Sequence, residues 1–320
     1  MIDVPAKLRH IKKAAGILSG SMERCVICPR RCAVNRAGGK KGYCRAPSNP
    51  VVYSYMAHHG EEPAISGSKG SGTIFFAHCN MRCVYCQNYY FSQLDNGEEA
   101  APGRLADMML GLQRRGCHNI NLVSPTHFMP QIVTALEYAV EKGLSIPIVY
   151  NTGGYELPEM IRSLDGVVDI YMPDMRYSDN AMAKRYSDAA DYVEYNRAAV
   201  KEMQGQTGDL VLDGNGLAER GLIIRLLALP GGISGIKESL LFIRDHLSPN
   251  AYLSIMSQYY PTFRSHEYRE LSGPVTAAEY ENIVDEAKKI GLNNGWVQEK
   301  PAKFDPRFRG TNIERKTDIE

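Results

Sequence analysis

Three closely spaced cysteines, Cys79, Cys83 and Cys86, are the part of this 320-residue chain best suited to chemistry. They follow an apolar run, residues 73–77, which predicts a buried strand and places the cysteines on the loop at its carboxyl end. Three thiolates can hold one face of a [4Fe–4S] cluster, and because such a cluster takes four ligands, one iron stays open to an outside ligand. The spacing also fits a zinc site that takes a fourth ligand from elsewhere. Three cysteines cannot all pair into disulfides among themselves.

A second group of cysteines precedes the first. It consists of Cys25, Cys28, Cys32 and Cys44. Gly38, Gly39 and Gly42 lie before the fourth cysteine and allow a tight return of the chain. Four thiolates can enclose a metal completely, so the spacing predicts either a closed structural zinc site or a second iron–sulfur cluster for electron relay. The remaining cysteine, Cys117, is expected to be a buried core residue.

The composition excludes some classes of protein. A hydrophobic content of 44% and a charged content of 23% are ordinary for a soluble globular chain. The net charge of +1 argues against a nucleic-acid binder, because such proteins concentrate basic residues. No apolar stretch approaches the roughly 20 residues that span a bilayer, and no signal peptide is evident. A cytoplasmic protein is therefore expected, in which cysteines bind metal before they form disulfides.

From residue 71 onward, short apolar runs alternate with amphipathic segments. Strands are predicted at 73–78, 119–123, 146–150, 167–172, 222–228 and 251–256. Helices are predicted at 104–115, 129–142, 156–163, 179–204, 235–247 and 276–290. Six strand–helix units imply an α/β protein with a parallel sheet and right-handed crossovers, short of the eight units of a closed barrel.

The front of the chain is expected to be separate from this repeating part. An amphipathic helix is predicted from residue 5 to 18, and residues 46–70, rich in proline, glycine and serine, are predicted to be a connector across the surface. The predicted organisation is an N-terminal helix and cysteine-rich segment at 1–65, a barrel at 66–300 and a C-terminal tail at 301–320.

Polar residues and glycines gather after the predicted strands. Parallel α/β folds bind ligands on the loops at the carboxyl ends of their strands. The candidate binding residues on these loops are His127, Asn151, Thr152, Asp174, Arg176, Gly231, Ile233 and Gly235. A barrel with only a structural role would not need such loops at one end of every unit, so the sequence predicts a ligand site there.

The cysteine loop resembles a known motif. Its C-x3-C-x2-C spacing, with the aromatic Tyr85 before the last cysteine, is similar to that of the radical S-adenosylmethionine (SAM) superfamily. The resemblance implies a partial (β/α)6 barrel, of the TIM-like radical SAM type, whose first strand delivers the cysteine loop. It also implies a [4Fe–4S] cluster on Cys79, Cys83 and Cys86, with SAM bound to the open iron. An electron from a flavodoxin- or ferredoxin-type donor would cleave SAM to a 5′-deoxyadenosyl radical.

Further segments resemble one branch of that superfamily. The Cys28-Pro29 step and the end of the cysteine group, residues 42–45, look like its N-terminal cysteine segment. Asn151-Thr152 and Met172-x-Asp174 resemble segments that shape the ribose and cation side of the pocket in glycyl-radical-enzyme activases such as pyruvate formate-lyase-activating enzyme. Asn151 stands where those proteins often have Asp, and Arg176 where they often have Lys.

The resemblance assigns expected roles to the remaining candidates. The loop of Gly231, Ile233 and Gly235 fits G-x-I-x-G-x-x-E, which lies along the adenine of SAM in radical SAM proteins. Asp174 is expected to bind SAM or a cation, and the alternative is an exposed carboxylate at a helix start. His127 stands where the usual Gly-Gly-Glu segment is absent, and it is expected to be either a proton carrier near the substrate or a packing group.

The sequence thus predicts a radical SAM enzyme that abstracts a hydrogen atom from its substrate, with a glycyl radical enzyme as the substrate that the resemblance implies. The first alternative is a radical SAM enzyme that acts on a small molecule or makes another protein modification. The second is a non-catalytic iron–sulfur or zinc protein for electron transfer or assembly, which would have no need of an adenosyl pocket. The sequence does not name the substrate.

Overall fold

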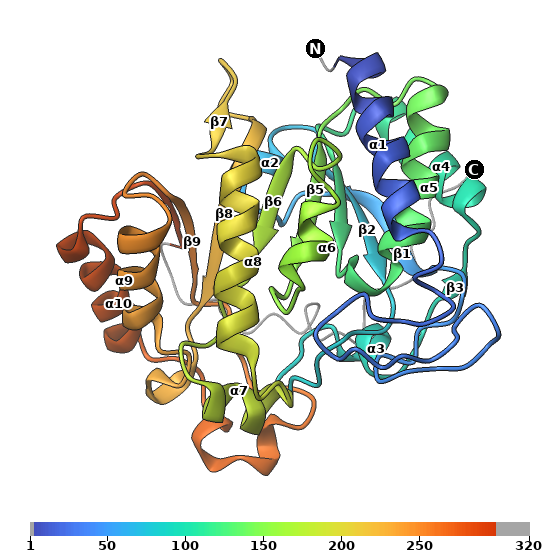
Figure 1. The fold of residues 1–320 in the computed structure, drawn as a ribbon. Helices are drawn as coiled ribbons and strands as arrows, with labels where there is room; N and C mark the ends of the chain where they lie inside the picture. Colours follow the sequence, from blue (N-terminus) through green and yellow to red (C-terminus); the bar gives the residue numbers. More distant parts are fainter. Residues whose placement is uncertain (1–2, 299–320) are drawn as a thin grey trace.

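A mostly parallel sheet runs through the molecule (Figure 1). The computed structural model describes residues 3–298, with the strands β1 (Val51–His58), β2 (Ser71–Phe76), β3 (Glu98–Glu99), β4 (Ile120–Val123), β5 (Ile148–Thr152), β6 (Ile170–Pro173), β7 (Val211–Leu212), β8 (Ala218–Leu227), β9 (Tyr252–Met256) and β10 (Gly295–Val297). They pair in the order β10-β9-β8-β6-β5-β4-β2-β1-β3, and β7 pairs with β8 off this path. Neighbours from β2 to β10 are parallel, whereas β1 is antiparallel to both β2 and β3.

Helices connect and cover these strands. They are α1 (Val4–Leu18), α2 (Pro63–Ser66), α3 (Tyr89–Ser92), α4 (Pro102–Arg114), α5 (Met129–Glu141), α6 (Pro158–Arg162), α7 (Asn180–Ser187), α8 (Tyr192–Thr207), α9 (Ile236–His246) and α10 (Ala277–Ile290). Short 3-10 turns are η1 (Thr126–Phe128), η2 (Pro230–Gly232), η3 (Ser265–Glu267) and η4 (Arg269–Leu271). In Figure 1, α6 and α8 lie in front of the strands, with α4 and α5 on one side of them and α9 and α10 on the other.

The predicted α/β class and partial barrel are confirmed. Each of the six predicted strands is present, and its ends lie within four residues of the prediction. Every residue of β2, β4, β5 and β6 is buried. Parallel strands covered on both faces read as continuous apolar runs, which is why the sequence located them well.

The prediction of a surface connector over residues 46–70 is wrong. Residues 51–58 form β1, which pairs antiparallel with β2 and extends the sheet. The side chains of Val51, Val52 and Tyr55 are buried. The free energy gained by burying them against the sheet outweighs the loop tendency of the prolines and glycines around them. The boundary expected at residue 65 therefore falls after a strand of the sheet.

The single helix predicted at 179–204 is also wrong, because the chain breaks between α7 and α8. Asp188 adopts a left-handed conformation, with φ 52° and ψ 41°, and ends α7. The break serves the cysteine loop, whose backbone N–H groups at Arg82 and Val84 donate to the carbonyls of Ser187 and Tyr186 at 3.0 and 2.9 Å. A tertiary contact thus overrides the helix pattern.

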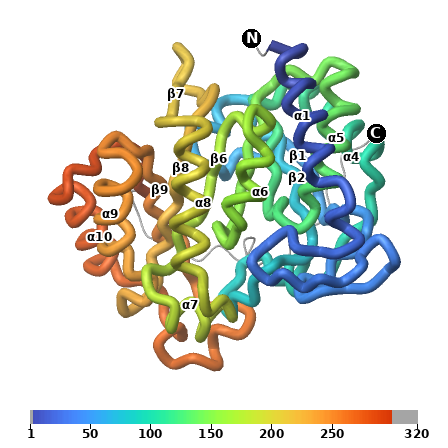
Figure 2. The backbone as a smooth tube through the Cα atoms, viewed as in Figure 1, coloured from blue at the N-terminus to red at the C-terminus, as the bar shows by residue number. Residues whose placement is uncertain are grey.

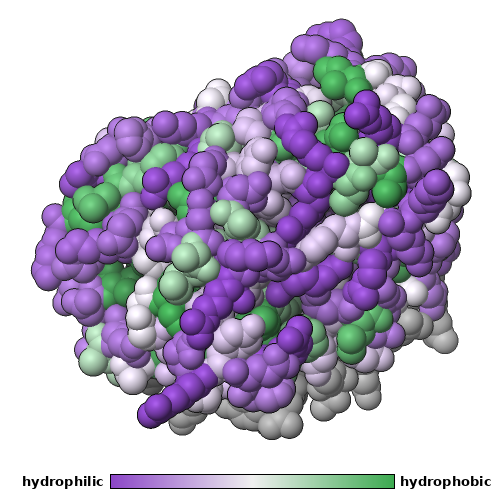
Figure 3. All heavy atoms as spheres, turned by 60° about the horizontal axis from the view of Figure 1, so that its bottom comes forward, coloured by the Kyte–Doolittle hydropathy of each residue, from purple (hydrophilic) through white to green (hydrophobic). Residues whose placement is uncertain are grey.

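The carboxyl ends of the strands lie at the lower edge of Figure 1, where the loop that follows β2 and the helices α3 and α7 are found. The long N-terminal excursion between α1 and β1 reaches the same edge (Figure 2). Figure 3 turns the lower edge of Figure 1 toward the viewer. The surface seen there is mostly hydrophilic, and its hydrophobic areas are small and separate.

Within residues 3–298 we find no helix with the length and apolar composition of a membrane span. The predicted tail at 301–320 lies outside the described residues.

Candidate functional site

The loop of residues 79–86, called the cluster loop below, is fixed from three sides. It leaves β2 through His78, whose φ of 68° turns the chain sharply. Its backbone pairs with the end of α7, and the Asn80 side chain donates to the Tyr155 carbonyl at 2.7 Å. The loop then enters α3. These contacts hold three cysteines in a defined arrangement at the carboxyl end of the sheet.

Each thiol of the cluster loop has a polar neighbour. The Ser187 hydroxyl donates to Cys83 Sγ at 3.0 Å, the Ser92 hydroxyl lies 3.2 Å from Cys86 Sγ, and the Met81 N–H donates to Cys79 Sγ at 3.4 Å. Hydrogen bonds of this kind stabilise thiolates and tune the clusters that they ligate.

Burial raises the pKa of the Cys79 thiol to about 11, and the Cys83 thiol adds to the rise while Arg176 and Arg82 oppose it. Burial and the same Cys83 thiol raise the pKa of Cys86 to about 12. These thiols therefore stay protonated at neutral pH unless a metal takes the place of the proton, as a ligated metal does. Cys79 and Cys86 each interact electrostatically with Cys83, and the three thiols would supply three thiolate ligands to a cluster.

A cavity of about 150 Å³ adjoins the cluster loop. Its wall combines Cys86 with three charged side chains, Asp174, Arg176 and Arg225. Asp174 follows β6 and bridges to Arg225 of β8 across the sheet. The sequence predictions for Asp174 and Arg176 thus fall on the cavity next to the cysteines.

Asp174 is a carboxylate between two arginines. Its oxygens accept from Arg225 Nε at 2.8 Å and from Arg176 Nη2 at 2.5 Å, and only 6% of the residue is exposed. The alternative of an exposed carboxylate at a helix start is therefore wrong. Two guanidinium groups neutralise Asp174 and leave the cavity wall with a net positive charge, which suits a carboxylate ligand better than a cation.

Arg225 was not among the predicted site residues. It lies inside a strand whose neighbours are apolar, Leu222-Ile223-Ile224 before it and Leu226-Leu227 after it. A single charge in such a run rarely stays buried without a partner, and this contrast was the signal that the sequence offered.

Asn151 and Thr152 end β5 beside this network. The Asn151 side-chain oxygen accepts from Arg225 Nη2 at 2.8 Å, which ties it to the Asp174 group. The Thr152 hydroxyl instead donates to Glu156, a fully buried carboxylate that also accepts from Thr126 at 2.5 Å. Burial raises the pKa of Glu156 to about 7, although these hydroxyls oppose the rise.

The structure does not bring the predicted adenine loop into this cavity. Gly231, Ile233 and Gly235 follow β8 at the same end of the sheet, but they are not among the described residues of the cavity wall. Gly235 has φ 60°, and a Cβ on it would lie 1.9 Å from Ser178 Oγ. Packing and backbone conformation therefore account for this glycine without a ligand, and its role toward adenine stays a prediction.

His127 is 2% exposed and donates from Nε2 to the Ala77 carbonyl at 2.8 Å. Burial lowers the pKa of this imidazole to about 3, so it is neutral near pH 7. Its contacts support the backbone that leads into the cluster loop and explain a packing role. The role of proton carrier stays a prediction.

The four-cysteine segment, residues 25–44, folds back on itself. Cys25 and Val34 pair through their backbones at 2.9 Å, and a Cβ on Gly42 would lie 2.9 Å from Cys32 Cβ. The tight return expected from the glycines is therefore needed at Gly42. Burial raises the pKa of Cys28, and the nearby thiols of Cys44 and Cys25 raise it further. Three of the four cysteines of this segment are buried, and Cys32 is partly exposed. Cys117, outside the segment, is buried in the core as predicted.

The cysteine segment contacts the cluster loop directly. The ring of Tyr43 lies 3.8 Å from the Arg30 guanidinium carbon and 4.6 Å from that of Arg82. Arg30 also donates to the Asn80 carbonyl at 2.9 Å. Arg36, 1% exposed, donates to the His127 carbonyl at 2.6 Å and fixes the segment to the barrel.

Among residues 3–298, no three His, Cys, Asp or Glu side chains are arranged around a point that would suit a single metal ion. A cluster with a different iron at each thiolate requires wider spacing than one ion does. The second metal site on the cysteine segment stays a prediction.

Residues 73–208 match the family model of the Radical SAM superfamily. The match begins in β2, includes all three cysteines of the cluster loop and ends at α8. It supports the superfamily that the cysteine spacing predicted, and with it a [4Fe–4S] cluster and SAM as cofactors.

Two curated relatives come from Methanocaldococcus jannaschii. The uncharacterized protein MJ0674 is 29% identical over 289 residues, which cover 87% of this chain and 78% of the relative. The uncharacterized protein MJ0808 is 26% identical over 166 residues, or 46% of this chain and 48% of the relative.

Among solved structures, methylornithine synthase (PylB) has a TM-score of 0.46 at 12% identity, and covers 68% of this chain. The FeFe-hydrogenase maturase HydG from Carboxydothermus hydrogenoformans has a TM-score of 0.48 at 9% identity, also over 68% of this chain. The chain spans 60% and 50% of these two proteins, less than two thirds of either. At these scores the likenesses carry no functional argument.

Proposed function

We propose that this chain is a radical SAM enzyme in which Cys79, Cys83 and Cys86 hold a [4Fe–4S] cluster at the mouth of the partial barrel. The observation that carries the proposal is the position of the cluster loop, with three neighbouring thiols beside a cavity that Asp174, Arg176 and Arg225 line. A protein that only transferred electrons would need no charged cavity next to its cluster. The superfamily match over residues 73–208 supports the same reading.

The bound cofactors would supply one-electron cleavage of SAM to methionine and a 5′-deoxyadenosyl radical, which abstracts a hydrogen atom from the substrate. The chain's own groups position the reactants. Arg225 and Arg176 would attract the SAM carboxylate, and Asp174 holds both guanidinium groups in place. Asn151 orients Arg225 through a hydrogen bond to Nη2. The side chains of Asp174, Arg176 and Arg225 are mostly buried, which would limit the water around a radical and so its side reactions.

We propose a glycyl radical enzyme as the substrate class to test first. The Asn151-Thr152 and Met172-x-Asp174 segments support this choice, since they resemble those of activases. A small-molecule substrate is the second candidate, because two arginines at the cavity equally suit a small anionic substrate.

We further propose that the cysteine segment holds a second metal, either zinc or an iron–sulfur cluster. The contact of Tyr43 with both Arg30 and Arg82 supports a relay to the cluster loop, since it keeps the two regions adjacent. An external donor of flavodoxin or ferredoxin type would then supply the electron.

The test of the proposed function is an anaerobic SAM-cleavage assay. The protein is reconstituted with iron and sulfide, reduced with dithionite and incubated with SAM, and 5′-deoxyadenosine is quantified. We expect the product from the wild type and from Cys117→Ala, a matched control in the core, but not from Cys83→Ala. If the wild-type protein contains the iron of its cluster but forms no 5′-deoxyadenosine, the proposed enzymatic activity is refuted. Addition of a glycyl radical enzyme, with detection of its radical by EPR, distinguishes the substrate candidates. A glycyl radical signal would support the activase role, and its absence would favour a small-molecule substrate.

A further inference from the structure

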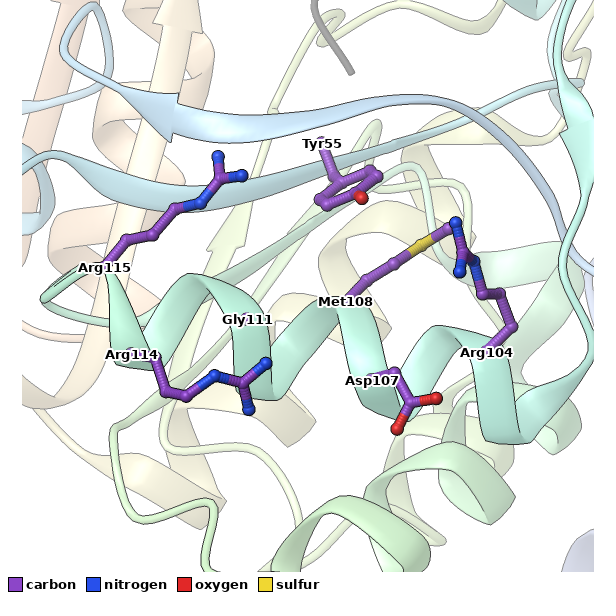
Figure 4. A pocket seen from close by; sticks show the side chains of 7 residues that line it. All are labelled: Tyr55, Arg104, Asp107, Met108, Gly111, Arg114 and Arg115. Carbon is purple, nitrogen blue, oxygen red and sulfur yellow. The ribbon is translucent and has the colours of Figure 1, made fainter. Parts of the chain in front are cut away.

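Another cavity lies outside the barrel, between β1 and α4, and the proposed function does not use it (Figure 4). Its volume of about 360 Å³ falls within the range of small-molecule sites. Tyr55 of β1 forms one wall, and one face of α4 from Arg104 to Arg114, with Arg115 just past its end, forms the other. We propose that this cavity, called the α4 pocket, binds a small anionic molecule that carries phosphoryl groups.

Unpaired positive charge is the first argument. Arg104, Arg114 and Arg115 line the α4 pocket, and within residues 3–298 none of their guanidinium groups has a hydrogen bond or an ion pair. The acidic residue of the wall, Asp107, lies 3.5 Å from Nζ of Lys142, which follows the last residue of α5. Three guanidinium groups against one carboxylate leave a net excess of two positive charges. Guanidinium groups bind phosphate oxygens through paired, charge-assisted hydrogen bonds.

The side chains are arranged around one space. In Figure 4, the guanidinium groups of Arg115 and Arg104 lie on opposite sides of the Tyr55 ring, and Arg114 lies in front of the helix near Gly111. Arg104 and Arg115 are eleven residues apart on α4 and its carboxyl end, which corresponds to about 16 Å along a helix axis. Charges at the two ends of such a slot favour a ligand with more than one anionic group over a single small anion.

The Tyr55 hydroxyl is a second, independent argument. Tyr55 is only 5% exposed, and its hydroxyl has no hydrogen-bond partner among the described residues. A buried hydroxyl without a partner destabilises the fold, and phenylalanine would avoid that cost. A phosphate oxygen in the α4 pocket would accept a hydrogen bond from this hydroxyl and give it a role.

Gly111 is the third argument. It lies in the interior of α4, where glycine is less stable than alanine. A Cβ on Gly111 would approach nothing closer than Arg114 Nη2, at 3.9 Å. Neither packing nor backbone conformation therefore explains the glycine. Its missing side chain leaves the floor of the α4 pocket open beneath Tyr55.

The test uses pyrophosphate as the probe, because it has phosphoryl groups but no adenine that could enter the SAM site. Binding to the full-length protein is measured by isothermal titration calorimetry at low ionic strength. We expect saturable binding in the wild type and at least a tenfold loss of affinity in Arg114→Ala/Arg115→Ala. Gly111→Leu should abolish binding by filling the floor, and it improves helix propensity, so the variant should fold. Arg9→Ala removes an exposed charge from α1 and should leave affinity unchanged.

Tyr55→Phe separates a ligand contact from a structural one. Removal of the unpartnered hydroxyl should leave the melting temperature of the free protein unchanged or higher, and it should weaken pyrophosphate severalfold. Saturating SAM should not compete with pyrophosphate, since no described residue lines both the α4 pocket and the cavity beside the cluster loop. The proposal is overturned if pyrophosphate fails to bind, if SAM displaces it, or if the double arginine variant and Gly111→Leu both bind it as the wild type does.

Discussion

The cluster loop and the cysteine segment both lie at the carboxyl end of the sheet, yet their surroundings differ. The cluster loop adjoins a charged cavity, and a thiol of that loop, Cys86, lines it. The cysteine segment contributes no residue to that cavity wall and folds back on itself instead, so closely that a Cβ on Gly42 would lie 2.9 Å from Cys32 Cβ.

This difference teaches what each cysteine region can do. Three ligands beside an open cavity suit a cluster that must exchange an outside ligand, whereas four ligands in a closed wrap suit a metal that only stabilises or relays. Under the proposed function the same residue type would serve two purposes, and the number of thiols and the neighbouring space would decide between them.

The largest expected effect comes from removing each cysteine set in turn. Substituting Cys79, Cys83 and Cys86 by alanine should remove about four irons per chain and all SAM cleavage. Substituting the four cysteines of the cysteine segment should leave the cluster loop loaded and lower the stability of the front of the protein. Iron and zinc analysis of both variants identifies the second metal. If the variant without the cluster-loop cysteines retains no metal, the cysteine segment binds no metal. The proposed difference between two metal sites would then be refuted.

The substitution Asp174→Asn tests the charged network that lines the cavity beside the cluster loop. The substitution keeps the shape of the side chain but leaves the guanidinium groups of Arg176 and Arg225 without their counter-charge. Loss of one partner from a buried ion pair typically costs about 3–5 kcal/mol of unfolding free energy, and we expect a loss of that order. Urea unfolding measures it, and SAM affinity should fall in parallel. The control Asp285→Asn breaks an exposed ion pair with Lys288 and should cost less than about 1 kcal/mol.

Glu156 connects the barrel with the cysteine segment, since it accepts a hydrogen bond from Thr152 of β5 and interacts electrostatically with Cys28. Its pKa rises from 4.5 to about 7 on folding, so the folded chain binds this proton more tightly than the unfolded chain. Stability from this group is therefore present below pH 4.5 and is lost as the pH rises toward 7, by about 3 kcal/mol in all. Urea unfolding at pH 5 and pH 8 should show that Glu156→Gln reduces the pH dependence. An unchanged pH dependence would contradict the buried, shifted carboxyl.

Ser187→Ala gives the smallest effect and concerns the cluster loop alone. In the proposed cluster the hydrogen bond from Ser187 to Cys83 Sγ would favour the more negative, reduced form, so its loss should make the reduction potential more negative. A difference of about 1 kcal/mol corresponds to about 40 mV for one electron. A redox titration followed by EPR measures the shift, and Ser163→Ala, a buried serine that bonds Met160, is the control. Equal potentials in both variants would mean that this hydroxyl does not tune the cluster.

The sequence predicted the sheet and the cluster loop because both are local patterns. Apolar runs located β2, β4, β5, β6, β8 and β9 but not the short parallel strand β10. Cysteine spacing located the thiols without knowledge of the fold. Arg225 and Ser187 were missed because their roles depend on partners far away in sequence: Asp174 lies 51 residues before Arg225, and Cys83 lies 104 residues before Ser187.

The errors have the same origin. The break at Asp188 follows from contacts with the cluster loop and with Arg30 and Tyr43 of the cysteine segment, none of which a helical pattern reveals. β1 escaped prediction because its partner strand, β2, decides whether the stretch is buried. Conformations that tertiary contacts impose cannot be read from local propensity.

The central claim is that the cluster loop alone holds a cluster with an iron open to SAM. The most direct measurement is EPR spectroscopy of the dithionite-reduced protein without the four cysteines of the cysteine segment, recorded with and without SAM. The account predicts a [4Fe–4S] signal that changes in shape when SAM is added and is absent after the further substitution Cys83→Ala. A signal that SAM leaves unchanged, or that survives the loss of Cys83, would contradict it.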